Sequence, residues 1–447
     1  MHRRRVSGGI HMTGVLRHKS MLLMTTAALG FYVTTARGAG VDLDTAGGSY
    51  DISAAGGNQT IESLSGVSGT SVLLGPNTLT FGNATSQTFA GTINGTGGIV
   101  KQGSGTQILT GTNIYTGGTT INAGKLALGA GGALAAAGSV NLGASGAGFD
   151  ISGAGSNQTI GALSGVAGTS VTLGPNTLSF GDATNQIFAG TISGTGGIVK
   201  QGIGTQILTG ANDFSGGTNF AAGGIVVGND SAFGRGGITV NGNAQLDNSA
   251  SVSLANSINV TGGATLSVNG SNGLTLGGVI SGGGGLTKNG AATLMLGGSN
   301  TYTGGTTINS GTLMITSGGA LASTGAMNLA GAGAALDISA AVSSQSIGEL
   351  TGAAGTSIAM GANSLTLGGA ANATFGGTIG GMGGITKTGW GRQTLTGTNT
   401  YTGGTTINAG TLALGAGGAL ATGGFVNLGA AGADFDISAA AVSYTHL

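Results

Sequence analysis

The sequence predicts an all-β protein folded as a β-solenoid, and three observations support this prediction. The segment Asn399–Leu412 recurs almost unchanged from Asn300 and from Asn113, and recurs in a degenerate form from Asn212. Most of the remaining chain consists of short runs in which apolar and small residues alternate, which is typical of strands. No segment after residue 40 has the charged, capped, 3.6-residue periodicity of a helix. Repeated units of this kind bury their apolar faces against one another.

The repeat has a period of 99 residues with one shorter copy. The aromatic residue of the motif recurs at spacings of 99, 88 and 99, at Tyr115, Phe214, Tyr302 and Tyr401. The tripeptide Asp-Ile-Ser recurs at spacings of 99, 187 and 99, at Asp51, Asp150, Asp337 and Asp436. The shortening falls between about Phe220 and Leu276, where similarity to the other copies is weakest. Duplication of a 99-residue block, with one copy eroded, accounts for these spacings.

Each block contains short strands that end at Gly or Asn, residues that tolerate the positive φ of tight turns. Examples are Thr78–Phe81, Thr177–Phe180, Ala264–Val268, Thr293–Leu296, Ser364–Leu367 and Thr411–Leu414. Such strands suit a β-sandwich, a propeller or a right-handed solenoid, and their near-identical succession favours the solenoid. With about 20 to 25 residues per coil, roughly 16 to 20 coils would form a rod about 75–95 Å long. We expect the following residues to face inward: Leu79, Phe81, Leu109, Ile121, Leu126, Leu128, Leu178, Phe180 and Leu208.

The composition is compatible with an ordered protein, although it is rich in glycine and poor in charged residues. One hundred glycines and only 6% charged residues in 447 could indicate a disordered, low-complexity chain. Disorder usually accompanies low hydrophobicity and high net charge, whereas this chain is 39% hydrophobic and has a formal net charge of zero. We therefore expect ordered β-structure around a thin core of Leu, Ile, Val and Phe. Cysteine is absent, which excludes disulfides and thiolate chemistry.

The N-terminal region has the pattern of an export signal. Basic residues at Arg3–Arg5 and Arg17–Lys19 precede the apolar run Met21–Val33, and small residues follow around Ala36–Gly38. The run is short for a transmembrane helix, and the alternatives are a membrane anchor or a start codon placed upstream of the real signal. Beyond residue 38 the chain carries 7 basic and 13 acidic residues, a net charge of −6. Nucleic-acid binding is not expected, because no basic patch remains.

The repeated motif resembles the autotransporter-associated β-strand repeat of type V secretion. Matching copies run over Gly97–Leu128, Gly283–Ile315 and Gly383–Leu414, with a partial copy at Gly196–Val227. The resemblance implies a right-handed parallel β-helix in the passenger of a Gram-negative autotransporter. Such a passenger is exported to the cell surface, the outer membrane or the medium. It also implies a parent protein with an outer-membrane β-barrel, which this fragment lacks.

The resemblance and the repeat together divide the chain into three regions. Residues 1–38 form the signal region, and residues 39–443 form the repeat-built passenger. Residues 444–447 are an aberrant or truncated end, because Tyr444–Leu447 fits no copy of the repeat.

The sequence offers little for catalysis. Residues 19 to 445 contain no histidine, which removes a Ser-His-Asp triad, a histidine zinc site and a histidine base from the repeats. The remaining candidates for a glycosidase-like site are the carboxylates Asp42, Asp44, Glu62, Asp434 and Asp436. The Asp-Ile-Ser aspartates recur with the block, whereas a catalytic pair need occur only once. We therefore predict no enzyme, no catalytic, cofactor-binding or metal site, and no cofactor.

Other repeated residues have structural interpretations. Asp150 lies in a weak match to a calcium-binding nonapeptide, and the 99-residue recurrence favours an aspartate that accepts hydrogen bonds at a turn. We expect Lys101, Lys200, Lys288 and Lys387 to be solvated turn residues, and the motif aromatics to pack in the core or a turn. Gly282–Gly285 lacks the Lys and helix of a phosphate loop. Trp390 is the one aromatic residue that we expect to be an exposed contact.

These observations favour a secreted or surface-displayed structural stalk, adhesin-like, that acts by self-association or by contact with a host surface or glycan. The alternative is the scaffold of an enzyme-bearing passenger whose catalytic domain lies outside this chain. A third hypothesis is ice or glycan binding through threonine pairs, which are too widely spaced in sequence to tile a lattice: Thr119–Thr120, Thr306–Thr307 and Thr405–Thr406.

Overall fold

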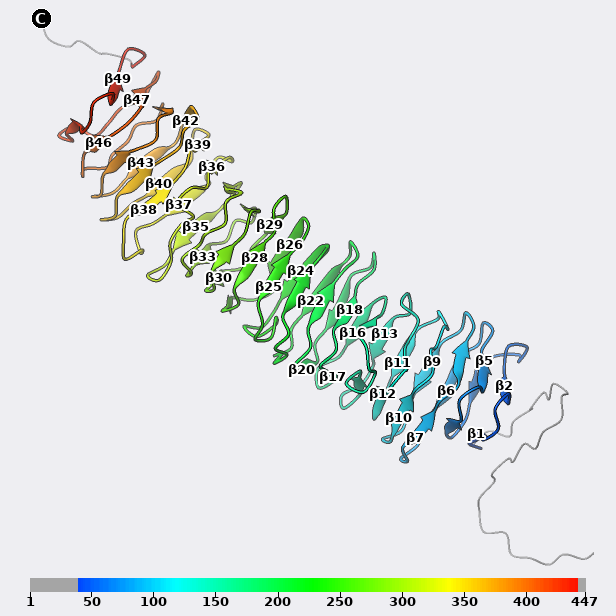
Figure 1. The fold of residues 1–447 in the computed structure, drawn as a ribbon. Helices are drawn as coiled ribbons and strands as arrows, with labels where there is room; N and C mark the ends of the chain where they lie inside the picture. Colours follow the sequence, from blue (N-terminus) through cyan, green and yellow to red (C-terminus); the bar gives the residue numbers. More distant parts are fainter. Residues whose placement is uncertain (1–38, 441–447) are drawn as a thin grey trace, which may run out of the picture.

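The protein is an all-β rod (Figure 1). The computed structural model describes residues 39–440, and these residues form 49 strands and no helix, so none of them forms a helix able to cross a membrane. The chain winds from one end of the rod to the other in about 20 turns. At about 4.8 Å per turn the rod is roughly 95 Å long. The solenoid prediction is confirmed, and right-handedness stays a prediction. The predicted export signal and the aberrant end lie outside the described residues.

Each turn visits three faces in the same order, and every strand pairs in parallel with a strand of at least one neighbouring turn. Leu79, for example, pairs with Ile99, about 20 residues later. Face one is split into two ladders by a gap. The first ladder comprises β1 (Val41–Leu43), β4 (Leu64–Gly66), β7 (Gln87–Phe89), β10 (Thr106–Leu109), β12 (Lys125–Leu128), β14 (Gly148–Asp150), β17 (Ser170–Gly174) and β20 (Thr191–Gly194). The second comprises β27 (Val252–Leu254), β30 (Leu274–Leu276), β33 (Leu294–Leu296), β35 (Thr312–Ile315), β37 (Ala335–Asp337), β40 (Ser357–Ala359) and β43 (Thr378–Gly380).

Face two is split into three ladders. They are β2 (Ser49–Asp51), β5 (Ser71–Leu73) and β8 (Thr92–Asn94); then β15 (Gln158–Thr159), β18 (Leu178–Phe180), β21 (Ile198–Lys200), β23 (Thr218–Phe220), β25 (Ile238–Val240), β28 (Ile258–Val260) and β31 (Ile280–Ser281); then β38 (Gln345–Ile347), β41 (Leu365–Leu367), β44 (Ile385–Lys387), β46 (Thr405–Ile407) and β48 (Val426–Leu428).

Face three is one continuous sheet that runs the length of the rod, and we call it the long face. Its strands are β3 (Gln59–Thr60), β6 (Leu79–Phe81), β9 (Ile99–Lys101), β11 (Thr119–Ile121), β13 (Val140–Leu142), β16 (Leu163–Gly165), β19 (Gln186–Phe188), β22 (Thr205–Leu208), β24 (Gly223–Val227), β26 (Ala244–Asn248), β29 (Thr265–Val268), β32 (Gly285–Lys288), β34 (Thr306–Ile308), β36 (Met327–Leu329), β39 (Leu350–Gly352), β42 (Ala373–Phe375), β45 (Arg392–Leu395), β47 (Thr411–Leu414) and β49 (Asp434–Asp436).

A buried asparagine bridges the turns where a face lacks a strand. The side chain of Asn113 accepts a hydrogen bond from the Ile93 amide of the turn below, at 3.0 Å. It donates to the Ala133 carbonyl of the turn above, also at 3.0 Å. Equivalent pairs of contacts are made by Asn212, Asn300 and Asn399. The Ala133 carbonyl also accepts from the Asn113 backbone N–H, so the side-chain oxygen makes the bond that backbone groups do not, to the amide of the turn below. This contact explains why each copy of the motif begins with Asn.

The core is a narrow column of side chains enclosed by the three faces. Along a typical strand, buried residues alternate with partly exposed ones, because successive side chains point to opposite sides of a sheet. All nine residues expected to face inward are buried. The prediction of a thin core is therefore confirmed at the level of individual residues.

Candidate functional site

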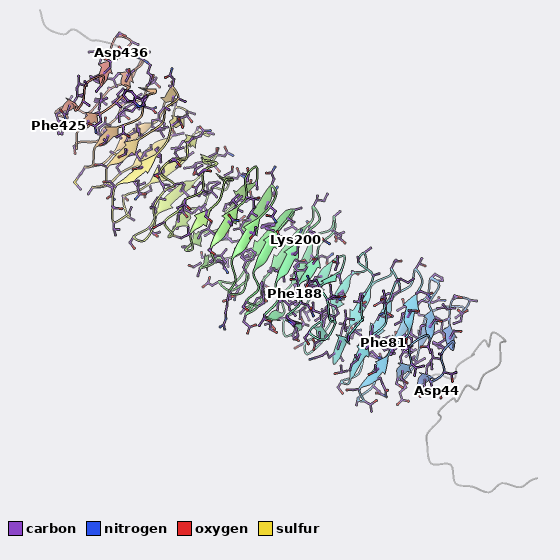
Figure 2. The ribbon with its side chains drawn as sticks, viewed as in Figure 1. Asp44, Phe81, Phe188, Lys200, Phe425 and Asp436 are labelled. Atoms are coloured by element: carbon purple, nitrogen blue, oxygen red, sulfur yellow. The ribbon has the colours of Figure 1, made fainter. Side chains whose placement is uncertain are left out.

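The candidate carboxylates fall into two groups at opposite ends of the rod. Asp42 and Asp44 lie in the first described turn, whereas Asp434 and Asp436 lie in the last, and Figure 2 shows Asp44 and Asp436 at opposite ends of the rod. Glu62, near the first end, accepts a 3.4 Å hydrogen bond from Asn83. Residues 39–440 contain no group of three or more acidic or histidine side chains that could hold a metal ion.

The repeated aspartates stabilise turns. In each copy one carboxylate oxygen accepts a hydrogen bond from the backbone N–H two residues later, at 2.8–2.9 Å, as seen at Asp51, Asp150, Asp337 and Asp436. Contacts of this kind define an Asx turn. The interpretation of these residues as turn acceptors is confirmed.

The prediction that the four lysines are solvated is wrong. Lys101, Lys200, Lys288 and Lys387 are buried. The Lys101 ammonium donates to the carbonyls of Gln102 and Gly103 at 2.8 Å and to that of Ala123 at 3.2 Å. The stacked turns leave these carbonyls without backbone partners, and an ammonium group has three donors to satisfy them. Burial lowers the pKa of Lys101 and Lys200 to about 8. A charged residue at a turn is usually exposed, but here carbonyls of its own turn and of the next one surround the ammonium group.

The motif aromatics pack inside the rod, as predicted. Tyr115, Phe214, Tyr302 and Tyr401 are all at most 2% exposed. Burial raises the pKa of Tyr302 to about 12. Trp390 is 76% exposed, in agreement with its interpretation as a surface residue.

The threonine pairs do not form paired arrays, because one member of each pair faces the core. Thr119, Thr306 and Thr405 are buried, and their neighbours point outward. The outward neighbour instead joins a column of polar residues from successive turns. On the long face this column runs through Ser267, Thr287, Thr307, Asn328 and Thr351. Sequence reasoning missed the column because its members come from different positions of the repeat.

A recess of about 420 Å³ opens between the β29–β30 connection and the β32–β33 connection of the next turn. It is lined by Asn269, Gly270, Ser271, Asn289, Gly290, Ala291 and Ala292. No titratable side chain lines it, so it offers hydrogen bonds and no acid or base.

Comparisons with known proteins agree with this architecture. The family model for the passenger-associated-transport-repeat matches residues 99–128, 198–227, 286–315 and 385–414. Each match begins within a strand that carries a buried lysine, and it contains the bridging asparagine and the motif aromatic. The chain thus carries four copies of this passenger-associated repeat.

The chain is also similar to the adhesin BmaC autotransporter of Brucella suis biovar 1 (strain 1330). The two are 36% identical over 143 residues, which cover 31% of this chain and 4% of the relative. The chain therefore aligns with only a small part of that much longer relative. No solved structure matches the chain. The repeats, this similarity and the β-solenoid fit a fragment of an autotransporter passenger.

Proposed function

We propose that this chain is part of a surface-displayed autotransporter passenger of a Gram-negative bacterium and serves as an adhesin-like stalk. The observation that carries the proposal is the uninterrupted long face, whose strands pair in series from the first described turns to the last. A rod built in this way holds its parts at a fixed separation. The similarity to a protein named as an adhesin supports contact with another surface as the purpose of that reach.

The rod suits display because each turn is stabilised by its neighbours. Stability in such a repeat is roughly a sum of local terms, so the rod tolerates changes in length. The absence of cysteine from the sequence is compatible with crossing a membrane unfolded. The parent protein is expected to supply the outer-membrane translocator.

A stalk without a catalytic site of its own also fits the chemistry of the described side chains. The candidate carboxylates lie in two groups at opposite ends of the rod, and Asp436 already accepts a turn hydrogen bond and pairs with Arg392. The similarity to a protein named as an adhesin also supports a non-enzymatic role. Host contact and self-association are both compatible with the polar outer faces.

Cell attachment by the displayed parent protein tests this function. A non-adherent Gram-negative host should gain attachment to epithelial cells, or should agglutinate, when it displays the parent protein. Both properties should fall to background when residues 39–440 are deleted in frame. Surface labelling of an epitope tag on the remaining parent protein controls for export. Undiminished attachment of the labelled deletion strain would show that the stalk is not needed. A surface hydrolase activity that disappears with a domain outside this chain would favour the enzyme-scaffold alternative.

A further inference from the structure

The fourth copy of the repeat carries two substitutions at one turn. Trp390 stands where the other copies have Ser104, Ile203 and Ala291. Arg392 stands where they all have threonine. Trp390 is the only tryptophan of the chain, and three quarters of its surface is exposed. Tryptophan side chains are usually buried, and burial of their large apolar surface stabilises a protein. An exposed indole does not contribute in this way, so its position favours contact with a ligand.

The two substituted side chains lie on the same side of the long face. From Trp390 to Leu395 buried and outward residues alternate, and Gly391, Gln393 and Leu395 are the buried ones. Arg392 and Thr394 therefore project outward from β45 (Arg392–Leu395), about 7 Å apart, and Trp390 is exposed in the turn that leads into this strand. The strand registers place Thr411 beside Arg392, and Thr374 beside Thr394. We call the exposed indole together with the side chains of Arg392, Thr394 and Thr411 the Trp390 patch.

An ion pair holds the arginine of this patch in place. The Arg392 guanidinium lies 2.5 Å from a carboxylate oxygen of Asp436, two turns along the rod. Asp436 is itself oriented by the Ser438 amide, and Thr411 donates to Asp434 at 3.3 Å. Fixed donors and acceptors lose little freedom when a ligand binds.

We propose that the Trp390 patch binds a neutral saccharide, an inference that rests on and deepens the proposed adhesive function. The apolar C–H face of a pyranose stacks on the indole plane. Its hydroxyls, which both donate and accept, exchange hydrogen bonds with the Arg392–Asp436 pair and with Thr411. Asp434 and Asp436 outnumber the single positive charge, so an anionic sugar is disfavoured. The residues beside Trp390 in the chain and in the adjacent turns are small, among them Gly391, Gly410 and Ala371, so the patch lacks the large apolar centre of a protein interface.

The unique tryptophan gives a direct readout of binding. Titration of the full chain with soluble neutral polysaccharides (mannan, dextran and galactan as probes) should quench or shift its fluorescence for at least one of them. Heparin and polygalacturonate should leave the emission unchanged. Unchanged emission with every neutral probe, or a preference for the anionic ones, would refute the proposal.

Substitutions identify the residues responsible. On immobilised probe, Trp390→Ala should lower the affinity at least about tenfold, and Arg392→Gln should lower it by a smaller factor. Ile203→Ala is the matched control, because Ile203 is the equivalent and equally exposed residue of the second copy. It should bind like the wild type, and far-UV circular dichroism should be the same for all three variants. Equal loss in Ile203→Ala would point to a general effect of the rod surface and would contradict a site at Trp390.

The two proposals fail in different ways. If cells displaying Trp390→Ala attach as well as the wild type while saccharide binding is absent from both proteins, the adhesive function stands and the saccharide site is refuted. If the chain binds a neutral probe through Trp390 but the displayed parent protein confers no attachment, the site stands and the adhesive function is refuted. If Trp390→Ala abolishes capture of a deglycosylated host protein and leaves saccharide binding intact, the patch serves a protein partner and the saccharide proposal is wrong.

Discussion

Thr218 lies four residues after Phe214, and among the described residues its buried hydroxyl has no hydrogen-bond partner. In the other three copies a tyrosine replaces the phenylalanine, and its hydroxyl lies within hydrogen-bond distance of the corresponding threonine. These pairs are Tyr115–Thr119 at 2.6 Å, Tyr302–Thr306 at 2.5 Å and Tyr401–Thr405 at 2.6 Å. The degenerate second copy has thus lost one hydroxyl and left its partner unsatisfied.

Restoring that hydroxyl should stabilise the rod. Phe214→Tyr supplies the missing partner of Thr218, and we expect a gain of about 1 kcal/mol. Hydrogen exchange of the β23 amides reports the local free energy of opening and does not require two-state unfolding. The matched variant Tyr302→Phe should create the same defect in the third copy and speed exchange in β34. Slower exchange in Tyr302→Phe, or faster exchange in Phe214→Tyr, would contradict this account.

Removing the side chain of a bridging asparagine should lower the free energy of unfolding by more than the loss of a tyrosine hydroxyl does. Asn300→Ala leaves the Ile280 amide without its side-chain acceptor, whereas the Ala320 carbonyl still accepts from the backbone N–H of residue 300. A loss of about 2 kcal/mol is expected, because the Ile280 amide is buried. Urea denaturation followed by circular dichroism measures this loss. Asn243, which is exposed, serves as the control, and Asn243→Ala should change stability by less than about 0.5 kcal/mol. Similar midpoints for the two variants would argue against a bridging role.

Stability should rise and then fall as the pH increases above 8. The folded pKa of Lys101 and Lys200 is about 8, against 10.5 for a free lysine. Between these values the unfolded chain binds more protons, so raising the pH favours the folded rod. Above about pH 10 the buried tyrosines act in the opposite sense, because the pKa of Tyr302 is raised to about 12 and tyrosine in the unfolded chain ionises near 10.0.

Thermal unfolding across pH 7 to 12 should therefore show a maximum near about pH 10. The double variant Lys101→Met and Lys200→Met should flatten the rise below that maximum and leave the fall above it. A wild-type stability that declines steadily from pH 8 would show that the lysines keep their ordinary pKa.

The rod shape gives a prediction for scattering in solution. The pair-distance distribution of the purified chain should peak at the width of the rod and extend to at least about 95 Å. A compact protein of this length would have a radius of gyration of about 22 Å. A symmetric, bell-shaped distribution would contradict the solenoid.

The sequence predicted the fold because the repeat and the alternation of residues such as Leu79 and Phe81 are local signals. It did not predict which side chains meet across turns. The bonds of Asn113 to Ile93 and Ala133 depend on the register between turns. The wrong prediction for Lys101 has the same origin, because one of the carbonyls that accept hydrogen bonds from its ammonium, that of Ala123, belongs to the next turn. Trp390 was recognisable as an exception in sequence, whereas its alignment with Arg392 and Asp436 required the strand pairing.

The number of turns in each repeat block links the length of the rod to the orientation of successive blocks around its axis. Residues 99 apart do not share a face: Leu64 is on face one and Leu163 on the long face, and Leu79 is on the long face and Leu178 on face two. A block is thus not a whole number of turns. Gaining or losing one copy by recombination would lengthen or shorten the rod and also swing everything beyond it around the axis onto a neighbouring side. A lineage that changes its number of copies would re-aim the tip of the molecule relative to the cell that carries it.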